Sequence, residues 1–189
     1  MIRPLKIALL LTAAACLAAG PAEARRHSTP KKDADQETTA KKDANKPQQV
    51  ASFGDWGAYL AKSGKGKTCY ALASPKERRP EAKRDAAYIF ISDRPAEKVH
   101  NEVSIIMGFP LKESGKAEAK VGRAAFDLVT KGSNAWIKNP EDEAKFVETL
   151  QKAGTLIVKA AAAKGPATVD SYALDGLKQA LGRISKDCK

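Results

Sequence analysis

The chain has 189 residues, of which 33 are Lys or Arg and 22 are Asp or Glu, giving a formal net charge of +11. Histidine occurs twice and cysteine three times, so the residue types that build metal centres are scarce, and we expect neither a metal nor a cofactor. Nucleic acid is a poor candidate partner, because no known DNA-binding motif or basic-aromatic interleaving accompanies the charge. The charge instead favours another anionic partner.

The first 24 residues (1–24) have the three parts of a secretory signal peptide. A basic start is followed by an apolar run over 7–19, which is too short to span a membrane, and a small-x-small site that ends at Ala24. We therefore predict cleavage after Ala24 and a periplasmic or secreted, surface-associated protein with no integral membrane span. Cleavage before Cys16 would instead produce a lipoprotein, for which the sequence pattern is weaker.

Residues 25–49 contain no large apolar side chain. Such a segment cannot bury enough apolar surface to offset the entropy lost on ordering, so we predict a disordered, charged tether. It serves either as an inert linker or as a spacer that lets the domain reach through the envelope. The folded domain is expected over 50–189, which is enough chain for one core.

Short runs of β-branched and aromatic residues recur at roughly ten-residue intervals in this domain, with turn residues between them. These runs predict a mainly β fold, either an antiparallel sandwich or a barrel-like sheet. The polar segment 74–84 is expected to be a loop, and the alanine-rich segment 159–164 is compatible with strand or helix. The expected strands cover 51–60, 68–73, 87–92, 102–109, 116–121, 124–129, 135–137 and 155–158.

Two short helices are predicted beside the strands. The first begins with Asn139 as N-cap and Pro140 at the first helical position, and Gly154 ends it. Its apolar stripe consists of Ala144, Phe146, Val147 and Leu150. The second helix follows the break at Gly165-Pro166 and runs to the C-terminus. Its apolar positions lie on one helical face and are Leu174, Leu177, Leu181, Ile184 and Cys188.

Removal of the signal peptide would leave two cysteines, Cys69 and Cys188. An even number of cysteines in an exported protein predicts a disulfide, which here would fasten the C-terminal helix to an early strand. The bridge would close a long loop, for which the chain-entropy model gives about 4–5 kcal/mol. The alternatives are two free thiols or a pair between molecules.

Catalytic chemistry has little support in the sequence. His27 lies in the tether, and His100, the one histidine of the domain, is expected to be a surface residue. A hydrolase would need a pocket that brings Ser or Asp to His100, and full exposure of His100 would count against it. The domain is therefore predicted to be non-enzymatic. Trp56 and Trp136 are expected to be core residues, with ligand stacking as the alternative.

A basic loop surrounds Pro80 and contains Arg78, Arg79, Lys83 and Arg84. Such a loop is either simply solvated or a contact patch for an anionic partner. We carry these four residues forward as a candidate patch for an anionic envelope component or host-cell surface.

Several segments together resemble the invasion-associated locus B family of alphaproteobacterial exported proteins. The resemblance spans nearly all of the domain and leaves out the tether. It implies a periplasmic or surface-associated β-rich domain, linked in some pathogenic members to entry into host cells, with no catalytic residues to carry over. The matching segments are Phe53-Gly54-Asp55-Trp56, residues 69–75, 101–104 and 108–110, Ala135-Trp136, and residues 170–177 together with Cys188.

The sequence thus predicts an exported, non-enzymatic envelope or surface binding protein that contributes to host-cell association or invasion. One alternative is a structural or stress-related periplasmic protein without a host role. A second alternative is a hydrolase whose catalytic site the sequence does not display.

Overall fold

The computed structural model describes residues 46–63, 66–81 and 83–189. The predicted signal peptide, with Cys16 and Ala24, lies outside these ranges, as does the predicted tether up to residue 45. The first strand already begins at Gln48, within the last two residues of the segment 25–49.

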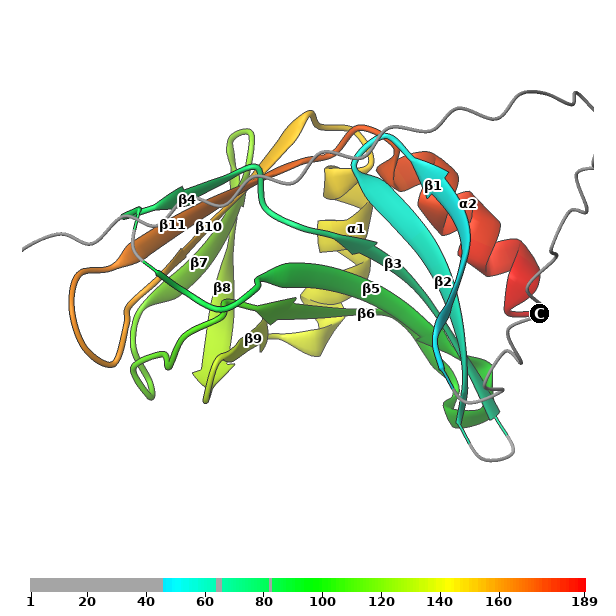
Figure 1. Ribbon diagram of the computed structural model, residues 1–189, viewed down its shortest axis with the longest axis horizontal. Helices are drawn as coiled ribbons and strands as arrows, with labels where there is room; N and C mark the ends of the chain where they lie inside the picture. The colour runs from blue at the N-terminus through cyan, green and yellow to red at the C-terminus, as the bar shows by residue number, and fades with distance from the viewer. Residues whose placement is uncertain (1–45, 64–65, 82) are drawn as a thin grey trace, which may run out of the picture. The chain divides into compact units, whose positions relative to one another are not determined.

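Antiparallel strands form one continuous sheet in the order β1-β2-β3-β5-β6-β9-β8-β7-β10-β11-β4 (Figure 1). The predicted mainly β, antiparallel architecture is therefore confirmed. The strands are β1 (Gln48–Phe53), β2 (Trp56–Ser63), β3 (Gly66–Ala73), β4 (Glu77–Arg79), β5 (Tyr88–Arg94), β6 (Val99–Ile106), β7 (Ala117–Val121), β8 (Ala124–Lys131), β9 (Asn134–Ile137), β10 (Thr155–Ala160) and β11 (Thr168–Ala173). The helices are α1 (Glu143–Leu150) and α2 (Leu177–Asp187), with 3₁₀ turns at Pro95–Glu97 and Pro140–Asp142.

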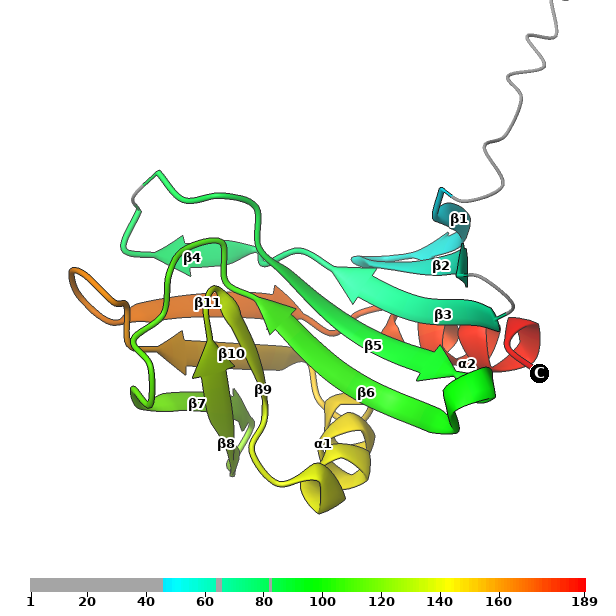
Figure 2. The ribbon, with the colours of Figure 1, turned by 90° about the horizontal axis from the view of Figure 1, so that it is seen from below.

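Strand β8 divides the sheet into two parts. Its first half pairs with β7 as far as Asp127, and its second half pairs with β9 from Leu128 onward. We call the part from β1 to the second half of β8 sheet A, and the part from the first half of β8 to β4 sheet B. The two parts are seen from two directions in Figures 1 and 2.

Both helices pack on one face of sheet A, which we call its inner face. Helix α2 lies against β1, β2, β3 and β5, and α1 lies against β6. The α1 side chain Phe146 is fully buried and meets the ring of Phe126 on β8 edge-on, with centroids 4.9 Å apart. The predicted C-terminal helix near a disulfide is confirmed.

The helical stripes differ in detail from the prediction. In α1, Phe146, Val147 and Leu150 are buried as expected, but Ala144 is exposed. Asn139 makes no side-chain capping bond to the helix backbone, and its amide instead contacts the carboxylate of Asp142 at 3.2 Å.

Three strands were missed or misplaced by the sequence prediction. The expected strand 51–60 is two strands, because Gly54, at a φ of 52°, allows a tight turn. The expected loop 74–84 contains β4, which pairs with β11. The segment 168–173, expected as the start of the last helix, is β11, whose alternation is hidden because its buried positions include Thr168 and Asp170.

Candidate functional site

The segment Phe53-Gly54-Asp55-Trp56 forms a junction with the chain just before α2. Trp56 is fully buried, as predicted, and its indole Nε1 donates to the carbonyl of Ala173 at 3.0 Å. The amide of Asp55 donates to the carbonyl of Asp175 at 3.2 Å. Gly176, at a φ of 87°, lies directly against the carbonyl of Phe53. These contacts are structural, and they account for two of the segments that carry the family resemblance.

The disulfide joins Cys69 on β3 to Cys188 at the end of α2, with Cα atoms 5.9 Å apart. The amine of Lys67 fastens the same end, donating to the carbonyls of Asp187 at 2.5 Å and Lys189 at 2.8 Å. Cys69 is fully buried and Cys188 nearly so. The C-terminal end of the chain is thus held on the inner face of sheet A.

The predicted basic patch separates into two pairs of residues. Arg78 and Arg84 both contact the fully buried carboxylate of Asp170, at 3.2 Å and 2.8 Å. Arg78 also donates to the carbonyls of Asp85 and Met107, at 2.8 Å and 2.7 Å. These two arginines hold β4 and the following loop against β11, so their guanidinium groups are engaged within the fold.

The other two members of the patch remain at the surface. The side chain of Arg79 is 76% exposed and lies 3.5 Å from Glu77, while Lys83 is exposed. Contact of this loop with an anionic partner therefore stays a prediction, with Arg79 and Lys83 as its accessible cations.

His100 lies at a groove of about 490 Å³ beside α2, which Asp93 and Ser185 also line. The His100 side chain is 66% exposed, and its Nδ1 lies 3.9 Å from Asp93 Oδ1, beyond hydrogen-bonding distance. That carboxylate oxygen instead accepts the backbone amide of Asn101 at 2.9 Å. Although the three residue types of a triad line this groove, their geometry is not that of an oriented base and nucleophile.

The described part of the chain contains no group of three or more His, Cys, Asp or Glu residues that could hold a metal ion. Within the same residues, no helix is both long enough and apolar enough to cross a membrane.

A row of uncharged side chains crosses the outer face of sheet A, the face opposite the helices. Each member pairs with the next member on the neighbouring strand, through all seven strands of sheet A. Paired residues lie on the same face of a sheet, and successive residues of a strand alternate between its two faces, so the whole row lies on one face. In order across the sheet, the row is Ser52, Gly57, Leu72, Phe90, Ser104, Trp136 and Val129.

Two flanking rows extend this surface on either side. On one side Tyr59 pairs with Tyr70, which pairs with Ser92, and on the other Tyr88 pairs with Ile106, which pairs with Asn134. We call the apolar part of this surface the aromatic face. It consists of Tyr59, Tyr70, Leu72, Tyr88, Phe90, Ile106, Val129 and Trp136.

The rings of the aromatic face contact one another. Tyr59 and Tyr70 stack with centroids 5.2 Å apart and an interplanar angle of 6°, and Phe90 lies 5.6 Å from Tyr70 and 6.0 Å from Tyr88. Gly57 leaves room for the Tyr59 ring, since a Cβ there would lie 2.5 Å from it. Burial, with a smaller contribution from Tyr59, raises the pKa of Tyr70, so the Tyr70 hydroxyl stays protonated at neutral pH.

The aromatic face has no helix over it, because α1 and α2 occupy the inner face (Figure 1). Among the residues that the structure describes, Val129 is the one large apolar side chain that is highly exposed, at 44%, and the other members of the face are half-buried. Trp136 is therefore not the core residue that the sequence predicted. In the same residues, the hydroxyls of Tyr59, Tyr70 and Tyr88 have no hydrogen-bond partner.

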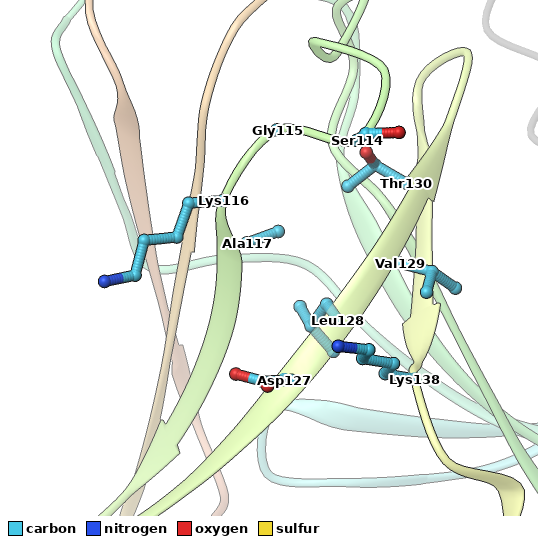
Figure 3. Close-up of a pocket in the computed structure, with 9 residues that line it drawn as sticks. All are labelled: Ser114, Gly115, Lys116, Ala117, Asp127, Leu128, Val129, Thr130 and Lys138. Carbon is cyan, nitrogen blue, oxygen red and sulfur yellow. The ribbon is translucent and has the colours of Figure 1, made fainter.

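The Val129 end of the aromatic face borders a groove of about 490 Å³, where β7 and β8 separate (Figure 3). Lys116 just before β7 and Lys138 just after β9 line it, with β8 running between them. Asp127 contributes the one carboxylate of its lining, and the hydroxyl of Thr130 closes one end by donating to the carbonyl of Lys112 at 3.1 Å. Cations thus outnumber carboxylates in this groove.

No protein-family model and no curated protein matches the chain. Among solved structures, the crystal structure of invasion associated protein B from Bartonella henselae is similar, with a TM-score of 0.51 and 16% sequence identity over 72% of this chain and 94% of that one. At this identity the likeness shows a shared fold. The predicted resemblance to the invasion-associated locus B family is therefore confirmed for the fold, and membership of the family stays a prediction.

Sequence reasoning did not identify the aromatic face, although one signal for it was present. The run Tyr88-Ile89-Phe90-Ile91 is apolar at consecutive positions, a pattern typical of strands buried on both sides. In the structure Ile89 and Ile91 are fully buried, whereas Tyr88 and Phe90 face outward. A strand that is apolar on both sides needs cover on both faces of its sheet. The two predicted helices are too few to cover both faces, so this run indicated an apolar face without a helix over it.

Proposed function

We propose that this chain is an exported, non-enzymatic binding protein of the cell envelope or cell surface, and that the aromatic face holds its partner. The observation that carries the proposal is the continuous uncharged row from Ser52 to Val129 on the face of sheet A that has no helix over it. Contiguous apolar surface of this kind marks interaction sites in folded proteins.

The proposed location rests on three supports. The sequence of residues 1–24 has the features of a signal peptide. The Cys69–Cys188 disulfide is of a kind that persists in oxidising compartments. The similar solved structure is that of a protein named as invasion associated. A contribution to association with host cells is the finer part of the proposal.

An anionic partner is supported by the charge of the chain and its distribution. The formal net charge is +11, and the groove beside Val129 carries Lys116 and Lys138 against Asp127. A partner that carries negative charge would be attracted to this end of the aromatic face, and the attraction would weaken as salt increases.

A substitution at the most exposed position of the face tests the proposal. We expect Val129→Glu to weaken binding of the oxidised mature protein to envelope fractions and host-cell membranes by at least about tenfold, since it places a charge on the apolar surface and offsets the nearby lysines. The matched control is Gln179→Glu, which adds the same charge at an exposed position of α2.

Binding would be measured by co-sedimentation at low salt, with circular dichroism to verify that each variant is folded. Equal binding by Val129→Glu and Gln179→Glu would contradict the aromatic face as the binding surface. Failure of the unsubstituted protein to bind any of these materials would contradict the binding function itself, and a damaged envelope with normal host entry in a deletion strain would favour the structural role.

The groove that contains Asp93, His100 and Ser185 keeps a hydrolase as the second candidate. A hydrolase reading predicts turnover of ester or amide substrates that His100→Ala abolishes. Activity that persists in this variant, or no activity in the unsubstituted protein, would remove the candidate.

A further inference from the structure

Two lysines flank the Val129–Trp136 pair at one end of the aromatic face. Lys131 follows Val129 on the same side of β8, and Lys138 follows Trp136 on the same side of that chain segment, because alternate residues of a strand share a face. Lys116 also lines the adjoining groove, but its amine points away from Lys138 and Val129 (Figure 3). In the described part of the chain, none of the three forms an ion pair.

We propose that the aromatic face binds an acidic polysaccharide, with its sugar rings along the row from Leu72 to Trp136 and its acidic groups at Lys131 and Lys138. This inference rests on the proposed function and adds the chemical class of the partner. It requires one extended ligand that has both apolar ring surface and negative charge.

The direction and spacing of the row favour a sugar chain. The row runs across the strands, whose neighbours lie about 4.8 Å apart, which is close to the advance of one sugar ring along an extended polysaccharide. An extended peptide would instead gain its affinity from backbone hydrogen bonds along a strand edge. Leu72, Phe90 and Trp136 point out of the sheet, where no backbone groups are offered.

The chemistry of the face also fits sugar rings. Polar side chains lie among the apolar ones, since Ser104 lies between Phe90 and Trp136 and Asn134 lies beside Ile106. The unpartnered hydroxyls of the tyrosines add further donors and acceptors. Ligand sites commonly combine apolar walls with a few polar groups that fix orientation.

Two other occupants fit the surface less well. The segment 25–45 of this chain has no large apolar side chain and is itself basic on balance, so it offers neither apolar cover nor negative charge. Pairing of two copies through this face would bring Lys131 and Lys138 of both copies into one interface, where like charges repel.

The test measures binding of the oxidised mature chain to alginate oligosaccharides, with neutral dextran of the same length for comparison, by calorimetry over a range of salt concentrations. We expect dextran to bind at least about tenfold more weakly, because it lacks acidic groups. In Lys131→Gln/Lys138→Gln, the slope of log Kd against log salt should fall by about two, one for each lost cation.

The matched control is Lys178→Gln/Lys186→Gln, which removes two exposed lysines from α2 on the opposite side of sheet A. This control should bind alginate like the unsubstituted protein. Equal weakening in both double variants would show attraction to net charge alone and would overturn the inference, as would equal binding of alginate and dextran.

A second experiment distinguishes failure of this inference from failure of the proposed function. It measures binding to envelope and host-membrane material before and after digestion with protease. Retained binding to the digested material, with sensitivity to Val129→Glu, supports a polysaccharide partner. Loss of binding after digestion identifies a protein partner, which overturns the inference and leaves the binding function in place. No binding to material before digestion contradicts the proposed function as well.

Discussion

At the scale of single residues, Asp170 connects parts of the chain that are far apart in sequence. Its carboxylate is fully buried on β11 and receives Arg78 of β4 and Arg84 of the next loop. The guanidinium of Arg84 also lies 5.4 Å from the centre of the Phe109 ring. A buried ion pair contributes little against an apolar replacement, but removal of one partner leaves buried charge without compensation.

We therefore predict that Asp170→Asn lowers the free energy of unfolding by about 3 kcal/mol, since two arginines lose their counter-charge. Urea denaturation followed by circular dichroism measures this difference. Asp127→Asn is the matched control, because Asp127 is exposed and forms no ion pair within the described residues, and its effect should stay within about 0.5 kcal/mol. Similar effects of the two substitutions would contradict the structural role of Asp170.

At the scale of elements, α2 depends on attachments at both of its ends. Its C-terminal end is joined to β3 through Cys69–Cys188, two cysteines with a sequence separation of 119. The loop that this bond closes is long, so the bond removes much conformational entropy from the unfolded chain.

Replacement of both cysteines, Cys69→Ala/Cys188→Ala, should therefore reduce the free energy of unfolding by about 4 kcal/mol. Urea denaturation of both proteins without reductant measures the effect, and reductant should shift the unsubstituted protein toward the variant while leaving the variant unchanged. A reduction of less than about 1 kcal/mol would show that the bond does not hold the helix.

The N-terminal end of α2 depends on close packing at Gly176. Because this glycine has a φ of 87° and an added Cβ would lie 1.7 Å from the Phe53 carbonyl, we predict that Gly176→Ala destabilises the protein by at least about 2 kcal/mol. Gly182 is the control within the same helix, since it is exposed and an added Cβ there meets nothing within 4 Å.

Gly182→Ala should stabilise the protein by about 0.5–1 kcal/mol, because alanine favours the helix interior. Thermal unfolding of the two variants in parallel measures the difference. Opposite signs for the two substitutions are expected, and destabilisation by both would contradict the assignment of the junction to Gly176.

At the scale of the whole folded domain, sheet A has two apolar faces and helices on one of them. The inner face holds fully buried residues such as Ile89, Ile105 and Cys69 beneath α1 and α2. The outer face holds the half-buried rings of Tyr70 and Phe90. Packing of the helices on the inner face stabilises the fold, and the outer face has no helix over it.

The sequence was sufficient for the fold class, for most strands and for the pairing of Cys69 with Cys188. These features depend on local alternation, turn residues and the number of cysteines, all of which are visible in one sequence. The prediction failed for β11, since Thr168 and Asp170 are buried polar residues whose partners come from other parts of the chain. It also missed β4, a strand of three residues whose central member, Arg78, contacts that same Asp170.

The candidate site was harder to predict than the fold. The basic loop was proposed from composition, but Arg78 and Arg84 turn inward because a carboxylate distant in sequence, Asp170, lies opposite them. The aromatic face requires the strand order and register, because Leu72, Phe90 and Trp136 become neighbours only through pairing across the sheet. Neither arrangement follows from local pattern alone.

The most direct test of the account is nuclear magnetic resonance of the isotope-labelled, oxidised mature protein during titration with solubilised envelope or host-membrane fragments. We expect the largest shift changes at Tyr59, Phe90 and Trp136 on the aromatic face, with little change along α2. Changes concentrated at Arg79 and Lys83, or in the groove around His100, would contradict the aromatic face as the binding surface of this protein.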